Sequence, residues 1–357
     1  MSVKFHPPQT HILPLTLIRR LRALPWPGEV LIGTGNSVEP SDVVARAGKP
    51  RPHLILDVSS KLDVSVEQAQ ECYLKRPGEP VQQGEPLAVR KGLFGGRKIT
   101  SPVEGMILTI EAGRMIIQPR PEMFELRALL SGTVTSLSPG VGVTVETRGA
   151  LIQGVWGSGK EGYGVLKMGV EEPDAVLTGD QIEVSHHGSI LICGATLDME
   201  LLRKAQEVQA RGIIVGAVPA NLQEQVSQQI LPVIATEGMG QIPISSTIFK
   251  LLQANEGREA MMLAVTPQRW QAARPEIIIP LPVSTTPEKP PQPGRVLEAG
   301  QKVRIKRAPF WGQVGIVQSV HTEPRVIEGG IKYPGAKVTL DDGTAVFVPY
   351  VNLDLVG

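Results

Sequence analysis

The chain has 357 residues, enough for two to four domains that each bury a hydrophobic core. Its 36 Lys and Arg residues nearly balance 35 Asp and Glu residues, so overall charge excludes a protein built as a polycation for a polyanionic partner. Glycine (38) and proline (31) are abundant and aromatic residues make up only 4%, which is typical of many short strands joined by tight turns. Cys72 and Cys193 lie far apart in mostly apolar surroundings, which indicates reduced core thiols.

Residues 1–27 are expected to form an N-terminal arm. The stretch ILPLTLIRRLRALPWPG predicts one or two helical turns, with Leu17, Arg20 and Leu21 on one face and with Pro25 and Pro27 ending them. The N-terminus lacks the order of basic, apolar and small residues of a signal peptide, and no run approaches 18 apolar residues. We therefore expect a cytoplasmic protein without membrane insertion.

Residues 28–184 contain an internal repeat of the form G-x-x-V-x6-A. Its three copies have identical internal spacing, which predicts a strand, a tight turn at the glycine, and a second strand that starts at an inward-facing valine. The copies are Gly35–Val38–Ala45, Gly78–Val81–Ala88 and Gly140–Val143–Ala150. The segments SPVEGMILTI and LLSGTVTSLSP share a further pattern of a small residue, glycine and hydrophobic residues. The irregular distance between copies favours barrels or sandwiches of short strands over a solenoid.

This region resembles the barrel-sandwich hybrid, the biotinyl/lipoyl-like family, over roughly residues 28–170. GEPVQQGEPL matches the first strand pair of that family, and SPVEGMI matches the strand that returns from the hairpin. In biotin carriers the hairpin carries the modified lysine, whose position here falls on Phe94, followed by Gly95-Gly96. Phenylalanine cannot form the amide bond to biotin or lipoate, and Lys91 and Lys98 only flank the tip. The resemblance therefore implies a structural unit without a covalently attached cofactor.

Two further patterns are interpreted as structural. GVWGSGKEGYG (154–164) approaches a phosphate-binding loop, but Glu161 stands where a magnesium-binding hydroxyl is needed, and the following residues have a strand pattern. His186-His187 has no acidic or cysteine partner at the spacing of metal ligands, so we expect a surface or strand-entry histidine pair and no metal.

Residues 185–279 alternate strands and helices, which predicts a small, largely parallel α/β domain. The helix DMELLRKAQEVQARG is expected to be capped by Asp198 and ended by Gly212. Because parallel sheets bind ligands at the carboxyl ends of their strands, Thr196 and Glu237 are candidate ligand-binding residues at that edge.

Residues 280–296 hold six prolines and are expected to form a semi-rigid linker. The final block, 297–357, resembles the KOW motif of NusG-type elongation factors and of ribosomal proteins with an SH3-like barrel. The resemblance depends on GQKVRIKRAPFWGQVGIVQSV (300–320) and on strands closing at VPYVNLDLV. The loop HTEPRVIEGGIKYPGA (321–336) is longer than a minimal barrel needs.

A binding face is predicted on this barrel. Its candidate residues are Lys302, Arg304, Lys306, Phe310 and Trp311. The three cationic residues alternate along a strand and so share one side, while Val303 and Ile305 point into the barrel. An aromatic pair beside a basic row can stack on nucleic-acid bases or contact a peptide.

The sequence as a whole predicts a multidomain, mainly β protein with one α/β domain. We expect a non-enzymatic binding or adaptor protein without a cofactor, whose KOW barrel contacts RNA, the ribosome, RNA polymerase or a protein partner. A docking or accessory subunit of an enzyme complex, as in redox complexes that contain the barrel-sandwich hybrid, is the alternative. A weaker alternative is an enzyme or small-molecule binder at the α/β edge. The oligomeric state stays open.

Overall fold

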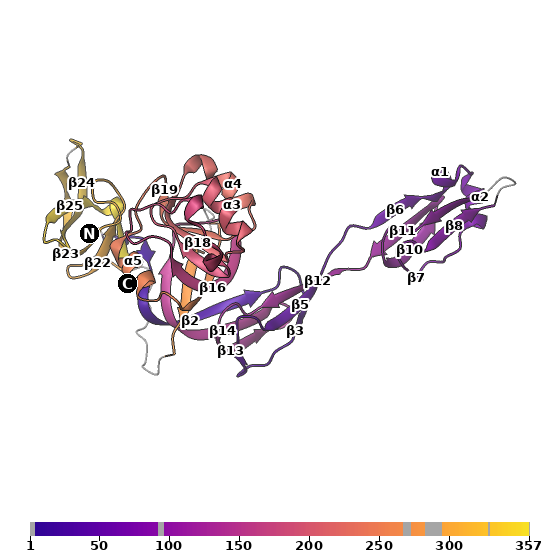
Figure 1. Cartoon of the computed structure of the whole chain (residues 1–357), viewed down its shortest axis with the longest axis horizontal. Coiled ribbons are helices and arrows are strands. Elements are labelled where there is room, and N and C mark those ends of the chain that lie inside the picture. The colour runs from indigo at the N-terminus through magenta and orange to yellow at the C-terminus, as the bar shows by residue number, and fades with distance from the viewer. Residues whose placement is uncertain (1–3, 92–95, 267–272, 283–294, 328, 357) are drawn as a thin grey trace.

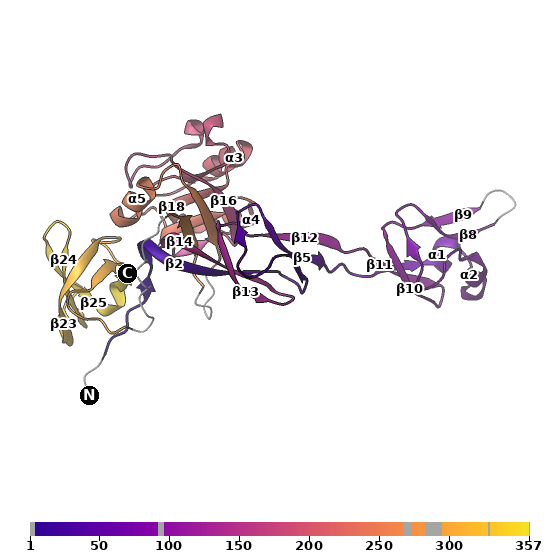
Figure 2. The same cartoon turned by 90° about the horizontal axis from the view of Figure 1, so that it is seen from below.

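In the computed structural model of the protein we describe residues 4–91, 96–266, 273–282, 295–327 and 329–356. The fold is mainly β, and the strands of these residues form several separate sheets. Two perpendicular views show an elongated molecule, with a large body at one end and a small β unit at the other (Figures 1 and 2). Two chain segments connect the body to the small unit.

The part of the body nearest this connection, here called the proximal unit, comprises residues 12–49 and 122–153. Its strands are β2 (Ile12–Ala23), β3 (Glu29–Val30), β4 (Ser37–Val38), β5 (Val43–Lys49), β12 (Glu122–Arg127), β13 (Gly132–Ser138) and β14 (Gly142–Gln153). The expected helical turns over residues 12–28 are wrong, because this segment is strand β2 and pairs antiparallel with β14. Pairing with β14 gives the backbone of β2 hydrogen-bond partners along almost the whole strand. Tertiary structure therefore favours a strand over the helical turns that the local pattern predicts.

The small unit at the far end, here called the distal unit, comprises residues 54–119. Its elements are β6 (Leu54–Asp57), α1 (Val58–Leu62), α2 (Val66–Cys72), β7 (Pro80–Val81), β8 (Pro86–Arg90), β9 (Arg97–Thr100), β10 (Gly105–Glu111) and β11 (Arg114–Pro119). It follows β5 through residues 50–53 and returns to β12 through residues 120–121, and both segments contain proline. Proline-containing segments are stiff spacers, which fits the separation of this unit from the body.

The three glycines of the repeat are turn residues with positive φ angles of 87°, 87° and 72° at Gly35, Gly78 and Gly140. The valine three positions after each glycine is at most 1% exposed, and the alanine of each copy is fully buried. The predicted turn glycine and inward-facing valine are therefore confirmed in all three copies.

Hydrogen bonds show that the distal unit repeats the proximal one. Leu31 N–H donates to Val44 O at 2.9 Å, and Leu74 N–H, 43 positions later, donates to Leu87 O at the same distance. Gly35 N–H donates to Val134 O and Gly78 N–H to Ile107 O, both at 2.7 Å, so the returning strands correspond 27 positions apart. The β8–β9 pair corresponds to the β5–β12 pair. The distal unit is thus inserted where the proximal unit would have its hairpin tip.

The α/β layer occupies the centre of the body. Its strands are β15 (Trp156–Gly157), β16 (Lys160–Met168), β17 (Ser189–Ile192), β18 (Gly212–Val218), β19 (Val233–Met239), β20 (Glu259–Ala264) and β21 (Glu276–Pro280). Its helices are α3 (Met199–Glu207), α4 (Gln223–Gln228) and α5 (Ser246–Gln253), with single 3-10 turns η1 (Gly179–Gln181), η2 (Val184–His186) and η3 (Ala220–Leu222). The sheet order is β15-β19-β18-β17-β16-β20-β21, and it continues through β14 into the proximal unit.

The predicted alternation of strands and helices in this layer is confirmed, and β16 to β19 are parallel. Helices α3 and α4 pack on one face of the sheet and α5 on the other, because their apolar residues fall in two different core clusters. Asp198 accepts a hydrogen bond from Leu201 N–H at 2.7 Å, so its expected capping role is also confirmed. The expectation for Gly212 is wrong: the helix ends at Glu207, Gln209 takes the positive φ, and Gly212 begins β18.

The C-terminal unit comprises residues 295–356. It contains β22 (Lys302–Ile305), β23 (Val314–Val326), β24 (Lys332–Leu340), β25 (Ala345–Pro349), the 3-10 turn η4 (Tyr350–Asn352) and β26 (Leu353–Val356). The N-terminal strand β1 (Gln9–Thr10) pairs parallel with β26 and completes a six-stranded sheet. Val303 and Ile305 lie in the core of this unit, as predicted.

Candidate functional site between the sheet edge and the C-terminal unit

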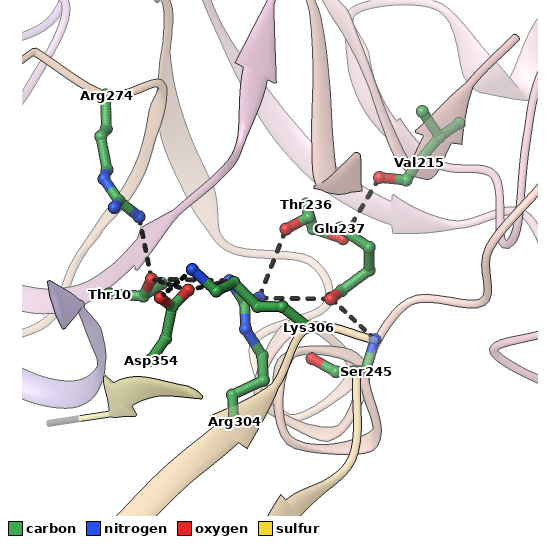
Figure 3. A network of polar contacts seen from close by, with 9 residues as sticks. All are labelled: Thr10, Val215, Thr236, Glu237, Ser245, Arg274, Arg304, Lys306 and Asp354. Atoms are coloured by element: carbon green, nitrogen blue, oxygen red, sulfur yellow. Dashed lines mark hydrogen bonds and ion pairs between the residues drawn. The ribbon is translucent and has the colours of Figure 1, made fainter. Parts of the chain in front are cut away.

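The two sets of residues that the sequence predicts as separate sites lie together. Glu237 is near the carboxyl end of β19, and Arg304 is in β22 of the C-terminal unit. Arg304 Nη1 donates to Glu237 Oε2 at 3.2 Å, and also to the Thr236 carbonyl at 3.4 Å (Figure 3). The side chains of Arg304 and Glu237 are only 2% and 1% exposed. The C-terminal unit therefore packs directly on the edge where a parallel sheet presents its ligand-binding groups.

The second carboxylate oxygen of Glu237 is held from the sheet side. Ser245 N–H, just before α5, donates to Glu237 Oε1 at 3.1 Å. Both oxygens of this carboxylate are thus hydrogen-bonded, one by the body and one by the C-terminal unit (Figure 3).

The other nitrogen of the Arg304 guanidinium faces the C-terminal and N-terminal strands. Arg304 Nη2 lies 3.5 Å from both Asp354 Oδ2 in β26 and Thr10 Oγ1 in β1. Thr10 Oγ1 donates to Asp354 Oδ2 at 3.2 Å and accepts from Arg274 Nη1 at 2.9 Å. Three chain segments that are distant in sequence therefore meet around one guanidinium (Figure 3).

The binding face predicted from the sequence is not open to solvent at Arg304, whose side chain is buried. Lys302 is exposed and Lys306 is half-buried. Both lysines share a side of the chain with Arg304, but at Arg304, the middle residue of the three, that side faces the α/β layer. Lys306 Nζ pairs with Asp354 Oδ1 at 2.8 Å. The physical reason is that Glu237 and Asp354 provide buried carboxylates, so the central guanidinium is neutralised within the chain instead of facing solvent.

A pocket of about 410 Å³ opens at this junction. Its walls are mostly apolar, and it is lined by Val155, Glu237, Gly238, Met239, Arg304, Ile305, Lys306 and Trp311. Trp311 is 42% exposed, and its ring passes close to Gly238, where an added Cβ would lie 3.8 Å from Trp311 Cζ2. The other predicted aromatic residue, Phe310, packs partly against the core of the C-terminal unit. Trp311 is thus the aromatic side chain that the pocket presents.

Thr196 lies outside this pocket. Its hydroxyl donates to the Gly240 carbonyl at 3.2 Å, which joins the segment between β17 and α3 to the loop after β19. Its observed role is to hold the loop that follows Glu237 and Gly238.

Two buried polar atoms at the junction, Arg304 Nε and Ser245 Oγ, have neither a hydrogen-bond partner nor an ion-pair partner within the described part of the chain. The ion pairs of the site join Arg304 and Lys306 to Glu237 and Asp354, and Arg274, which donates to Thr10, adds one further positive charge to the network.

Sequence reasoning missed Asp354, Thr10 and Arg274. The alternation of Asp354 with Leu353 and Leu355 predicts a solvent-facing aspartate, whereas all three residues are buried in the structure. A charged residue on an otherwise buried strand indicates an internal partner.

The other sequence candidates take simpler roles. The glycine-rich stretch 154–164 forms β15 and the start of β16, as its strand pattern predicted. His186 is buried, and its Nδ1 accepts from Glu183 N–H at 2.9 Å. Over the described ranges no group of three or more His, Cys, Asp or Glu residues could hold a metal ion. In the same residues no helix has the length and apolar character needed to cross a membrane. Phe94 of the carrier-like hairpin lies outside the described residues.

No protein-family model matches the chain, and a search of curated proteins finds no significant match.

Proposed function

We propose that the protein is a non-enzymatic adaptor that recognises a protein partner through the pocket between β19 and the C-terminal unit. In this proposal the C-terminal unit is an SH3-like KOW barrel, and the proximal and distal units are barrel-sandwich hybrids without the modified lysine. The observation that carries the proposal is the position of Trp311: its half-exposed ring forms one wall of a mostly apolar pocket beside the buried ion pairs of Arg304.

The balance of charge favours protein over RNA among the predicted partners. Phosphate contacts supply most of the affinity of nucleic-acid-binding proteins. Here Arg304 is committed to Glu237 and Asp354, and Lys306 is paired with Asp354, which leaves Lys302 as the exposed member of the predicted row. A half-exposed tryptophan at an apolar pocket, which a bound partner would desolvate, is instead typical of protein interfaces.

The geometry gives less support to an enzyme at the α/β edge. A general base needs a carboxylate that can accept a proton from a substrate. Both oxygens of Glu237 already accept hydrogen bonds from Arg304 and Ser245, and the Thr196 hydroxyl is bonded to a backbone carbonyl. The second candidate function, an accessory subunit of an enzyme complex, is supported by the separation of the distal unit from the body (Figure 1).

Site-specific photo-crosslinking in the cells that contain the protein tests this function. A photoreactive phenylalanine analogue replaces Trp311 in the full-length chain, and the matched control replaces Val326, which is 62% exposed on the β23–β24 hairpin. We expect a discrete protein adduct from position 311 that is absent from position 326. Binding of a labelled oligouridine at low salt, lost in the double variant Lys302→Glu/Lys306→Glu, would instead support RNA as the partner and overturn the proposal of a protein partner.

A further inference from the structure

The ionised side chains that line the pocket beside Trp311 differ in their exposure to solvent. The side chains of Glu237 and Arg304 are only 1% and 2% exposed. The side chain of Lys306, which lines the same pocket, is 35% exposed. Among the described residues of the pocket wall, Lys306 is therefore the ionised side chain that an entering molecule can reach.

The ammonium group of Lys306 keeps hydrogen-bond donors for a ligand. An ammonium group has three N–H donors. In the described part of the chain its ion-pair partner is Asp354, whose Oδ1 lies 2.8 Å from Lys306 Nζ (Figure 3). This contact uses one donor, so the other two can be directed to an acceptor oxygen of a molecule in the pocket.

The charges of the polar network around the pocket do not balance. Its cationic side chains are Arg274, Arg304 and Lys306, and its carboxylates are Glu237 and Asp354. Three cations against two anions leave one positive charge, so an anionic group bound beside Lys306 would complement the network. Phosphate recognition usually employs several accessible cations, whereas a single accessible ammonium suits a single carboxylate.

The other solvent-facing part of the pocket wall is apolar. Trp311 is 42% exposed and Val155 38%, and Met239 is half-buried. A tryptophan ring offers a large apolar surface, and the flexible methionine side chain adapts to the shape of the group that it contacts. This part of the pocket therefore favours a large apolar side chain next to the group that Lys306 binds.

The size of the pocket favours a short piece of polypeptide. Its volume of about 410 Å³ lies near the lower end of the range of roughly 300–1,000 Å³ that ligand pockets span. A space of this size suits one or two side chains of a partner better than it suits a large cofactor.

We propose that this pocket recognises a segment of the protein partner in which an acidic residue lies next to a large apolar residue. The apolar side chain packs against Trp311, Val155 and Met239, and the carboxylate accepts hydrogen bonds from Lys306 Nζ. The carboxylate also neutralises the positive charge that the network leaves over. This inference rests on the proposed function, because it names the chemistry of the partner that the same pocket would bind.

Peptide display on the full-length protein tests this inference. Random peptides are selected for binding to the parent protein and against binding to Trp311→Ala, so that the recovered peptides depend on the pocket. We expect most of them to carry an aspartate or glutamate close to a large apolar residue. Recovered peptides without this enrichment would overturn the inference and leave the proposed function standing. Failure to recover any peptide that depends on Trp311 would overturn the proposed function, and the inference with it.

Affinities of one recovered peptide then test the role of Lys306. Replacing the acidic residue of the peptide by its amide should weaken binding to the parent protein at least about fivefold. In Lys306→Met the same replacement should change the affinity by about twofold or less, because the partner of the carboxylate is gone. The control is Lys337→Met, which removes an exposed lysine of β24 outside the pocket and should preserve the full effect.

The comparison of the two peptides on the parent protein needs no protein variant, so it decides the matter even if Lys306→Met does not fold. An amide peptide that binds the parent as tightly as the acidic one would overturn the inference. So would an equal effect of the amide in Lys306→Met and in the parent, because the carboxylate would then be bound by another group.

Discussion

Arg304 and Glu237 are 67 residues apart in the chain and form a buried ion pair at 3.2 Å that joins the C-terminal unit to the edge of the α/β sheet. Sequence reasoning assigned one residue to a nucleic-acid or protein face and the other to a ligand edge. Their contact merges the two assignments into one site and removes the guanidinium from the exposed surface.

Replacing Arg304 by methionine should be strongly destabilising. The substitution leaves Glu237 and Asp354 as buried carboxylates without their shared cation, and breaking a buried ion pair in this way costs about 3–5 kcal/mol. The matched control is Arg19→Ala, which removes an exposed ion pair with Glu146 and should cost less than about 1 kcal/mol. Urea unfolding of both variants measures the difference; equal losses would contradict the assigned role of Arg304.

Gly78, in a turn, and Gly105, in strand β10, should differ in the free-energy cost of an added methyl group. Gly78 has a φ of 87° with open space around it, so Gly78→Ala should cost only the backbone strain of about 1–2 kcal/mol. At Gly105 a Cβ would lie 2.2 Å from the Gln118 carbonyl oxygen, so Gly105→Ala has to separate β10 from β11. That substitution should cost about 3 kcal/mol or more. Native-state hydrogen exchange of the β10 and β11 amides reports both values, and a larger loss in Gly78→Ala would refute the turn assignment.

Helix α3 and helix α5 differ in the capping of their first turns. Asp198 accepts from Leu201 N–H, so Asp198→Ala should destabilise the α/β layer by about 1 kcal/mol. Ser245 stands at the same position of α5, but its hydroxyl has no partner in the described residues and makes no capping bond. We therefore expect Ser245→Ala to be neutral or slightly stabilising. Thermal unfolding of the two variants provides the comparison, and a Ser245→Ala loss as large as that of Asp198→Ala would show that the hydroxyl is engaged.

Because His186 is buried, we expect the free energy of unfolding to decrease in mild acid. Burial, with a smaller effect of the nearby Lys167 charge, lowers the pKa of His186 below its ordinary value of 6.5. The unfolded chain therefore binds a proton near pH 6.5 that the folded chain takes up only at lower pH, so stability is lost as the pH falls from 6.5 towards the folded pKa. In His186→Asn this part of the pH dependence should disappear. Denaturant midpoints of both proteins between pH 7.5 and about pH 5 measure it; parallel curves would contradict the prediction.

How much the sequence predicts depends on whether the signal is local. The G-x-x-V spacing predicts the three turns because positive φ at glycine and burial at valine follow from neighbouring residues. Asp198 is found for the same reason, since a cap and its helix are adjacent in sequence. The prediction of helical turns over residues 12–28 is wrong because β14, the strand that pairs with β2, begins more than one hundred residues later in the chain. The expectation for Arg304 is wrong for the same reason. The alternation of residues shows which side of β22 Arg304 occupies, but it does not reveal what that side contacts.

Hydrogen–deuterium exchange of the full-length protein and of Arg304→Met tests most directly whether the sheet edge and the C-terminal unit form one site. If the ion pair joins them, backbone amides of residues 236–245 and of residues 303–313 should lose protection together in the variant, while those of the distal unit stay unchanged. Loss of protection in the C-terminal unit alone, with residues 236–245 exchanging as in the parent protein, would contradict the account.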